Sequence, residues 1–203
     1  ICDGWKLFGL DLDDRKQNAL RTIPRFERLY TVPPEKLSGR FDLLTLVHSL
    51  EHFPDPCSTL RTLFGKLTAN GRLFVQVPNV AKAPFDLVVA DHLCHFTPRS
   101  LSLIIARSGF GIDCIATDWV NKEISLLSSA GSEQDRHPVN DTPPETVGEI
   151  GRSVTWLQHF LDHAREVAAT GHFGIFGTSI SATCLAGGLG ETVGFFVDED
   201  PAR

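Results

Sequence analysis

The segment His48-Ser49-Leu50-Glu51-His52 combines two histidines and a glutamate at a spacing that could bind a metal. In the pattern H-x-x-E-H, two histidines one helical turn apart chelate zinc while the glutamate activates a water molecule. That chemistry needs a helical segment, but a predicted buried strand runs directly into His48, and Pro54 follows His52 within two residues. The sequence therefore disfavours a zinc site, and we predict no bound metal.

A second segment, Asp91-His92-Leu93-Cys94-His95, places one acid and two imidazoles directly before the start of a predicted helix. An imidazole beside a carboxylate can act as the general base for a substrate hydroxyl or carbon acid. His92, Asp91 and His95 are therefore candidate catalytic residues. The same residues could instead form a capped, hydrogen-bonded loop, and the residue types leave both interpretations open.

A third acidic position follows the first strand-like run, in the stretch Gly9-Leu10-Asp11-Leu12-Asp13. An acid at the end of the second strand of a nucleotide-binding sheet accepts hydrogen bonds from both ribose hydroxyls. A carboxylate at this place can equally cap the helix that follows. Asp11 is therefore either a ribose ligand or a helix N-cap.

Short apolar runs between turn and helix-start signals predict the elements that position these residues. The predicted strands are residues 5–10, 41–47, 72–77, 173–176 and 193–197, and the predicted helices are 15–22, 57–67, 98–109 and 147–169. Asn70-Gly71 is expected to cap the helix before the strand at 72–77, and the runs at 111–117 and 123–129 are expected to form an antiparallel edge.

The strand at 41–47 is continuously apolar, which is typical of a parallel strand buried on both faces. The sequence therefore predicts an α/β fold with a Rossmann-like, mostly parallel sheet. Ligands of such sheets bind outside the carboxyl ends of the strands. We expect Asp11, His48 and Asn79 to lie along one edge of the sheet, because each follows a predicted strand.

A polar, proline-bearing stretch over residues 132–144 indicates a domain boundary. We predict a first domain at 1–131, a linker at 132–146 and a smaller Rossmann-like β-α-β unit at 147–203. In this unit residues 177–182 open a helix after a strand, and Asp198 follows about 20 residues on, as in a dinucleotide fingerprint. Ser179, at the position of the middle glycine, would obstruct a pyrophosphate and disfavours a nicotinamide oxidoreductase.

The segment FDLLTLVHSLEHFPDP at 41–56 resembles the fourth-strand region of class I S-adenosylmethionine-dependent methyltransferases, and 67–73 resembles their L-K-P-G-G-x-L turn. The resemblance implies that S-adenosylmethionine is the cofactor and that Asp11, with its neighbour Leu12, meets the ribose. It also implies that a loop lies along the cofactor near the methyl-donating sulfur. The matching loop residues are His48, Ser49, Glu51 and His52.

Two further segments are similar to sugar C-methyltransferases. Residues 91–96 resemble their E-H-x-x-Y-F segment, with Asp91 in place of the glutamate and His95 in place of the tyrosine, and residues 195–203 resemble their V-D-D-N-P-A-K stretch. The resemblance implies methyl transfer to an oxygen or carbon of a small molecule such as a nucleotide sugar, with Asp91 and His92 at the acceptor.

The family's G-x-G-x-G loop has no counterpart before Asp11, and the chain contains no methionine. We therefore expect a fragment whose sheet is incomplete at its N-terminus, with a gap and exposed apolar surface where a strand is missing. Two alternatives stay open: a non-catalytic Rossmann-like binding protein and an NAD-dependent oxidoreductase.

Composition excludes several partners. The net charge is -6 and the lysines and arginines are scattered, so no basic stripe predicts nucleic-acid binding. The sequence has neither an apolar run of bilayer length nor a signal peptide, which predicts no membrane association. Five cysteines without a CxxC pair favour a reducing cytoplasm.

Overall fold

The computed structural model describes residues 4–130 and 144–200. Its N-terminal part contains strand β1 (Leu7–Leu10), the short helix α1 (Gln17–Leu20) and strand β2 (Phe26–Tyr30). The two strands pair in parallel. The first predicted strand is present but starts two residues later than expected, and the helix is limited to one turn.

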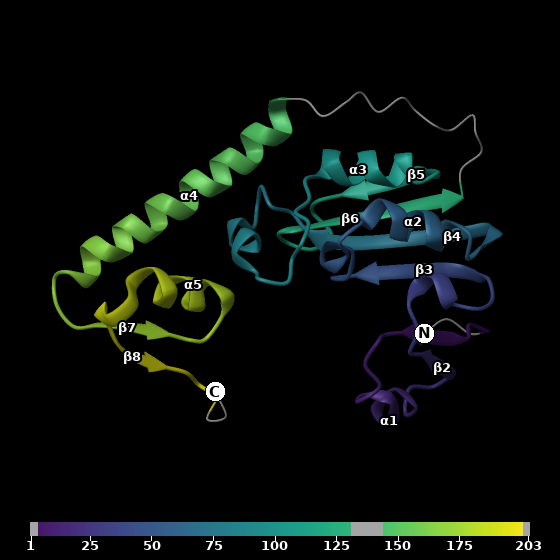
Figure 1. The fold of residues 1–203 in the computed structure, drawn as a ribbon, viewed down its shortest axis with the longest axis horizontal. Helices are drawn as coiled ribbons and strands as arrows, with labels where there is room; N and C mark the ends of the chain where they lie inside the picture. Colours follow the sequence, from purple (N-terminus) through teal and green to yellow (C-terminus); the bar gives the residue numbers. More distant parts are fainter. Residues whose placement is uncertain (1–3, 131–143, 201–203) are drawn as a thin grey trace.

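Four strands form the main sheet, in the order β3-β4-β6-β5 (Figure 1). They are β3 (Phe41–Val47), β4 (Leu67–Pro78), β5 (Phe110–Ala116) and β6 (Glu123–Ala130). Strands β3 and β4 are parallel, whereas β6 runs antiparallel to both β4 and β5. The α/β class and the antiparallel edge are confirmed, and three of the five strand pairs in the described chain are parallel.

Helices α2 (Pro56–Phe64) and α3 (Pro98–Arg107) contribute leucines and an isoleucine to the core of this sheet. Leu73, Val75 and Val77 alternate along β4 and are fully buried, as expected when every second side chain of a strand points to the same face. Each helix begins with a side-chain cap and a proline in its first turn, Asp55 for α2 and Thr97 for α3. These local signals fix where each helix starts, and the apolar side chains of each helix pack on the sheet.

Gly71 has a different role from the one that the sequence predicted. Helix α2 ends at Phe64 with Gly65 as its C-cap, so Asn70 and Gly71 lie inside β4 and do not cap the helix. A Cβ atom on Gly71 would lie 2.9 Å from Cβ of Leu67 and 3.0 Å from the carbonyl oxygen of Phe41. Glycine is needed here because the backbones of β3 and β4 approach closely.

Gly71→Ala is expected to lower the free energy of unfolding by about 1–3 kcal/mol, the usual cost of overpacking a tight site. Denaturant unfolding followed by circular dichroism measures the change. Gly187→Ala is the matched control: Gly187 lies in helix α5, where an added Cβ meets nothing within 4 Å, so alanine should stabilise the protein slightly. Equal destabilisation by both substitutions would contradict the close approach at Gly71.

The predicted gap in the sheet is present. No backbone ladder joins the β1–β2 pair to β3 within the described residues, and the two parts form separate sheets. The rings of Phe8 and Phe41 meet across this gap, with centroids 5.7 Å apart. Phe8, Leu10 and Val47 are exposed large apolar side chains on these strands, as expected for strands patterned to be buried.

The C-terminal unit consists of helix α4 (Pro144–Ala168), strand β7 (Phe173–Phe176), helix α5 (Ile180–Leu189) and strand β8 (Val193–Val197). Strands β7 and β8 pair in parallel, which confirms the predicted β-α-β unit. The last three residues of the predicted linker, 144–146, are the start of α4, and the rest of the linker lies outside the described residues.

Helix α4 contacts the segment around the 3-10 helix η3 (Pro84–Val88). The ring of Phe85, in η3, meets Trp156 and Phe160 edge-on with centroids 5.5 and 5.4 Å apart. The Ser153 hydroxyl donates to the carbonyl of Val80 at 2.8 Å. The packing thus reaches the segment just before the second histidine cluster. No helix in the described ranges is both long and apolar enough to cross a membrane.

Candidate functional site

His48 and Asn79 lie at the carboxyl ends of the neighbouring parallel strands β3 and β4. The amide of His48 donates to the carbonyl of Gln76 at 3.0 Å, and the amide of Asn79 donates to the carbonyl of Lys122 at 2.9 Å. His48 has a φ of 47°, a left-handed conformation that is uncommon outside glycine. This conformation turns the chain out of β3. His48 and Asn79 share one sheet edge as predicted, whereas Asp11 does not, because β1 belongs to a separate sheet.

Asp11 follows the separate strand β1. Its amide donates to the carbonyl of Tyr30 at 3.0 Å, and its Oδ1 accepts from the amide of Asp13 at 3.0 Å. The side chain therefore stabilises the turn after β1 and does not cap α1, whose N-cap residue is Lys16. Asp11 and Leu12 are both exposed, and their contact with a ribose stays a prediction.

The predicted cofactor loop contains the 3-10 helix η2 (Leu50–His52), which covers only the last three residues of the H-x-x-E-H motif and leaves His48 outside it. His48 and Ser49 reach the surface at least in part, and the Ser49 hydroxyl donates to the carbonyl of Val47 at 3.1 Å. Glu51 behaves differently, because its side chain is only 1% exposed. Its carboxylate is therefore directed into the protein and away from a surface-bound cofactor.

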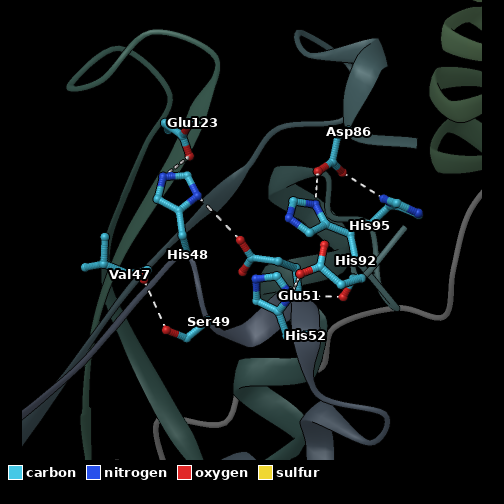
Figure 2. Close-up of polar contacts among 10 residues, drawn as sticks. Val47, His48, Ser49, Glu51, His52, Asp86, His92, His95 and Glu123 are labelled. Atoms are coloured by element: carbon cyan, nitrogen blue, oxygen red, sulfur yellow. Dashed lines mark hydrogen bonds and ion pairs between the residues drawn. The ribbon is translucent and has the colours of Figure 1, made fainter. Parts of the chain in front are cut away.

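The imidazole of His48 lies between two acidic side chains (Figure 2). Its Nδ1 is 3.4 Å from Oε1 of Glu51, and its Nε2 is 3.5 Å from Oε2 of Glu123. Among the residues described, neither Glu51 oxygen has a hydrogen-bond partner, and neither does Oε2 of Glu123. Burial raises the pKa of Glu123 above its usual range, although His48 acts in the opposite direction. Glu123 begins β6, and the stretch 121–123, which by sequence could reach a pocket but is more typical of a solvated turn, instead brings this carboxylate to His48.

The second histidine segment packs directly on η2. The carbonyl of Glu51 accepts hydrogen bonds from the amides of Leu93 and Cys94, at 2.8 and 3.1 Å. Nδ1 of His52 lies 2.9 Å from the carbonyl oxygen of Asp91, and the rings of His52 and His92 meet edge-on with centroids 4.9 Å apart. The structure therefore joins the two motifs into one site.

Asp86 is the carboxylate that holds His92 and His95. Its Oδ1 is 2.6 Å from Nδ1 of His92, and its Oδ2 is 2.8 Å from Nδ1 of His95. Asp91, the acid of the predicted cluster, has a side chain that is 78% exposed, with Oδ2 3.5 Å from Nδ1 of His52. Sequence reasoning missed Asp86, and the available signal was a charged residue inside the otherwise apolar run 85–89.

The other interpretation of this segment, a capped and hydrogen-bonded loop, is also correct in part. Thr97 and Ser100 form a capping box at the start of α3, so the histidines belong to a capped loop. Burial raises the pKa of the Cys94 thiol, which favours the unreactive protonated form and agrees with its lack of an assigned role. The cap does not exclude a catalytic role for the histidines, because Thr97 and Ser100 form the cap and the histidines do not.

In the dinucleotide-like segment of the C-terminal unit, polar side chains form hydrogen bonds with other residues of the same unit. Ser179 caps helix α5, accepting from the amide of Ala182, and the Thr178 hydroxyl donates to Oδ2 of Asp198 at 2.8 Å. Asp198 is the acid that would have to meet a ribose in the oxidoreductase alternative. This arrangement, like Ser179 itself, weighs against a dinucleotide at this position.

Comparison with known proteins adds independent information. Residues 3–115 match a family model described as a methyltransferase domain. Two curated relatives are ubiquinone biosynthesis O-methyltransferases. The one from Xanthomonas oryzae pv. oryzae is 36% identical over 64 residues, which cover 30% of this chain and 27% of the relative. The one from Marinobacter nauticus is 30% identical over 96 residues, covering 46% and 38%.

Solved structures show the same fold at low identity. An S-adenosylmethionine-dependent methyltransferase from Clostridium acetobutylicum aligns with a TM-score of 0.52 at 11% identity, covering 63% of this chain and 76% of that one. The 1,6-didemethyltoxoflavin-N1-methyltransferase of Burkholderia thailandensis, solved with S-adenosylhomocysteine, aligns with a TM-score of 0.50 at 17% identity, covering 64% and 63%. The chain spans only about a quarter to two-fifths of the curated relatives it matches.

Proposed function

This chain belongs to the methyltransferase-domain family, and from that premise we propose that its protein transfers a methyl group from S-adenosylmethionine to a hydroxyl oxygen of a small molecule. The names of the curated relatives support oxygen as the acceptor atom. Transfer to carbon, or to a nucleotide sugar, rests only on the resemblance of the segments at 91–96 and 195–203. The proposal concerns the intact protein, because the matched segments cover only part of those relatives.

One observation carries the proposal: Asp86 orients two imidazoles beside the loop at the carboxyl end of β3. The carboxylate accepts a hydrogen bond from the protonated Nδ1 of each ring. Nε2 of His92 and of His95 is then unprotonated and has a free lone pair. Either nitrogen can take the proton of an acceptor hydroxyl. The rest of the rate enhancement would come from aligning the acceptor for in-line displacement.

The residues present fit part of a cofactor site. Asp11 offers an exposed carboxylate at a strand end, and His48 and Ser49 border the edge shared by β3 and β4. When bound, S-adenosylmethionine supplies an electrophilic methyl group on a sulfonium sulfur. In the proposed arrangement Asp11 accepts hydrogen bonds from the ribose, the loop at 48–52 borders the sulfur, and His92 and His95 face the acceptor.

Asp11→Ala is expected to weaken binding of S-adenosylmethionine to the intact protein by roughly 1.5–3 kcal/mol, the range for hydrogen bonds to a charged group. The fold should be unchanged because the side chain is exposed. Isothermal titration calorimetry measures the affinity. Asp14→Ala, in the same exposed loop, is the charge-matched control, and an equal loss in both variants would refute a specific ribose contact.

The remaining alternative is a binding protein with the same fold and no catalysis. The measurement that bears on this choice is the binding of S-adenosylmethionine to the intact protein. An intact protein that shows no binding of S-adenosylmethionine by calorimetry would contradict the proposed function and favour the non-catalytic alternative.

A further inference from the structure

Glu51, His52 and His92 each offer one ligand atom, and these atoms lie within 4.8 Å of one another. We propose that the three side chains bind a divalent transition-metal cation. Figure 2 shows the Glu51 carboxylate lying between His48 and the rings of His52 and His92. The sequence predicted no metal because the H-x-x-E-H motif needs a helix that Pro54 and the strand before His48 do not allow. The proposed ligand set is a different one, since it includes His92 and leaves His48 out.

The strongest observation is the buried carboxylate. The Glu51 side chain is almost completely removed from solvent, and neither of its oxygens has a hydrogen-bond partner in the described chain. An ionised carboxylate is costly to bury unless it is paired or coordinates a metal. His48 lies at 3.4 Å on one side only, at ion-pair range but without a hydrogen bond. The other side of the carboxylate faces the two imidazoles.

The hydrogen bonds of both imidazoles prepare them as ligands. Nδ1 of His52 must donate to the carbonyl of Asp91, because a carbonyl oxygen only accepts. Nδ1 of His92 donates in the same way to the carboxylate of Asp86. Both rings therefore keep the Nε2 lone pair free. A carboxylate behind a histidine is the usual outer-shell support of a ligating imidazole, and Asp86 provides it.

The donor set indicates the class of cation. Two imidazoles and one carboxylate with open positions suit Zn²⁺, Fe²⁺ or Co²⁺ better than Mg²⁺ or Ca²⁺, which prefer oxygen ligands. Bonds of about 2.0–2.2 Å place the ligand atoms of one ion roughly 3–4 Å apart. The side chains must therefore close by on the order of 1 Å, which is a small rotamer adjustment. His52 is partly exposed, so an ion can enter from solvent.

Metal binding itself does not depend on methyl transfer, and only its catalytic meaning rests on the proposed function. A hydroxyl bound to a cation loses its proton more easily. With His92 engaged as a ligand, His95 is the second imidazole on Asp86 and stays free to accept that proton. The cation would then activate the acceptor oxygen, and the Asp86-bound His95 would remove its proton.

The test uses CoCl₂ as the probe on the whole chain, with calorimetry for affinity and visible absorption for the ligand field. We expect one Co²⁺ per chain and a rise in melting temperature on binding. Glu51→Gln and His52→Ala should each weaken Co²⁺ at least as much as the roughly 10- to 100-fold loss that removing an outer-shell partner causes. Asp86→Asn should fall within that roughly 10- to 100-fold range.

His163→Ala is the matched control, because His163 is an exposed histidine whose Nδ1 lies 3.7 Å from Glu166. Its Co²⁺ affinity should equal that of the unmodified chain. If Glu51→Gln fails to fold, His52→Ala at its partly exposed position still decides the question. Absence of binding at millimolar Co²⁺, or unchanged affinity in the ligand variants, would overturn the site. If the intact protein did not bind S-adenosylmethionine, the methyltransferase proposal would fail but Co²⁺ binding would be unaffected. The failure of one proposal can therefore be distinguished from the failure of the other.

Discussion

In the absence of added metal, His92→Ala is expected to lower the single-turnover rate of methyl transfer by the intact protein by roughly 10²- to 10⁴-fold, the range for loss of acid–base catalysis. The affinity for S-adenosylmethionine should be nearly unchanged, because His92 belongs to the acceptor side in the proposed arrangement. The large effect follows from geometry, since Asp86 fixes the ring through a hydrogen bond of 2.6 Å. Calorimetry beside single-turnover kinetics separates binding from chemistry.

The control for this variant is His159→Ala, an exposed histidine on α4. It should change neither the rate nor the affinity. His95→Ala provides a further comparison, because His95 is held by the other oxygen of the same carboxylate. If His92→Ala lost cofactor affinity as strongly as Asp11→Ala, the division of the site into a cofactor side and an acceptor side would be wrong.

Most elements could be predicted because their local signals agree with one another. The strand at Phe41–Val47 is continuously apolar and has the predicted bounds, and Thr97 followed by Pro98 marks the start of α3. The misplaced cap at Asn70 and Gly71 shows the limit of local reasoning. The signal of a helix end is the same as that of a glycine required by close strand packing, and only the tertiary contact with Phe41 distinguishes them.

The site could be predicted only in part, because its two halves are far apart in sequence. Both histidine segments were identified, but their association depends on the backbone bonds from Leu93 and Cys94 to the carbonyl of Glu51. Adjacent residues in a loop can point in different directions, so the carboxylate nearest to His92 in sequence, Asp91, is not the one that binds its Nδ1. Asp86 was undetectable by spacing, since no motif links it to the histidines.

The C-terminal unit illustrates a different limit. Its β-α-β order followed from apolar runs, but its contact with η3 did not, because Phe85 and Trp156 are unremarkable aromatic residues in sequence. The contact matters for the site, since Phe85 is the neighbour of Asp86 in η3. Helix α4 therefore packs on the segment that orients both histidines.

Phe110→Ala is expected to lower the free energy of unfolding by about 3–5 kcal/mol, the range for removing a buried aromatic side chain. Phe110 begins β5, is only 1% exposed, and meets the ring of Phe64 edge-on with centroids 5.1 Å apart. Its removal leaves a cavity between helix α2 and the antiparallel edge of the sheet, so the cost includes both the lost burial and the unfilled space.

Urea unfolding measured by fluorescence and circular dichroism gives this change directly, because the midpoint should fall while the slope stays constant. Phe176→Ala is the matched control, since Phe176 ends a strand but is 70% exposed. It should alter the unfolding free energy by about 0.5 kcal/mol or less, as surface substitutions usually do. A loss below about 1 kcal/mol in Phe110→Ala would contradict the close packing of α2 on this edge, since truncating a well-packed core aromatic costs more than that.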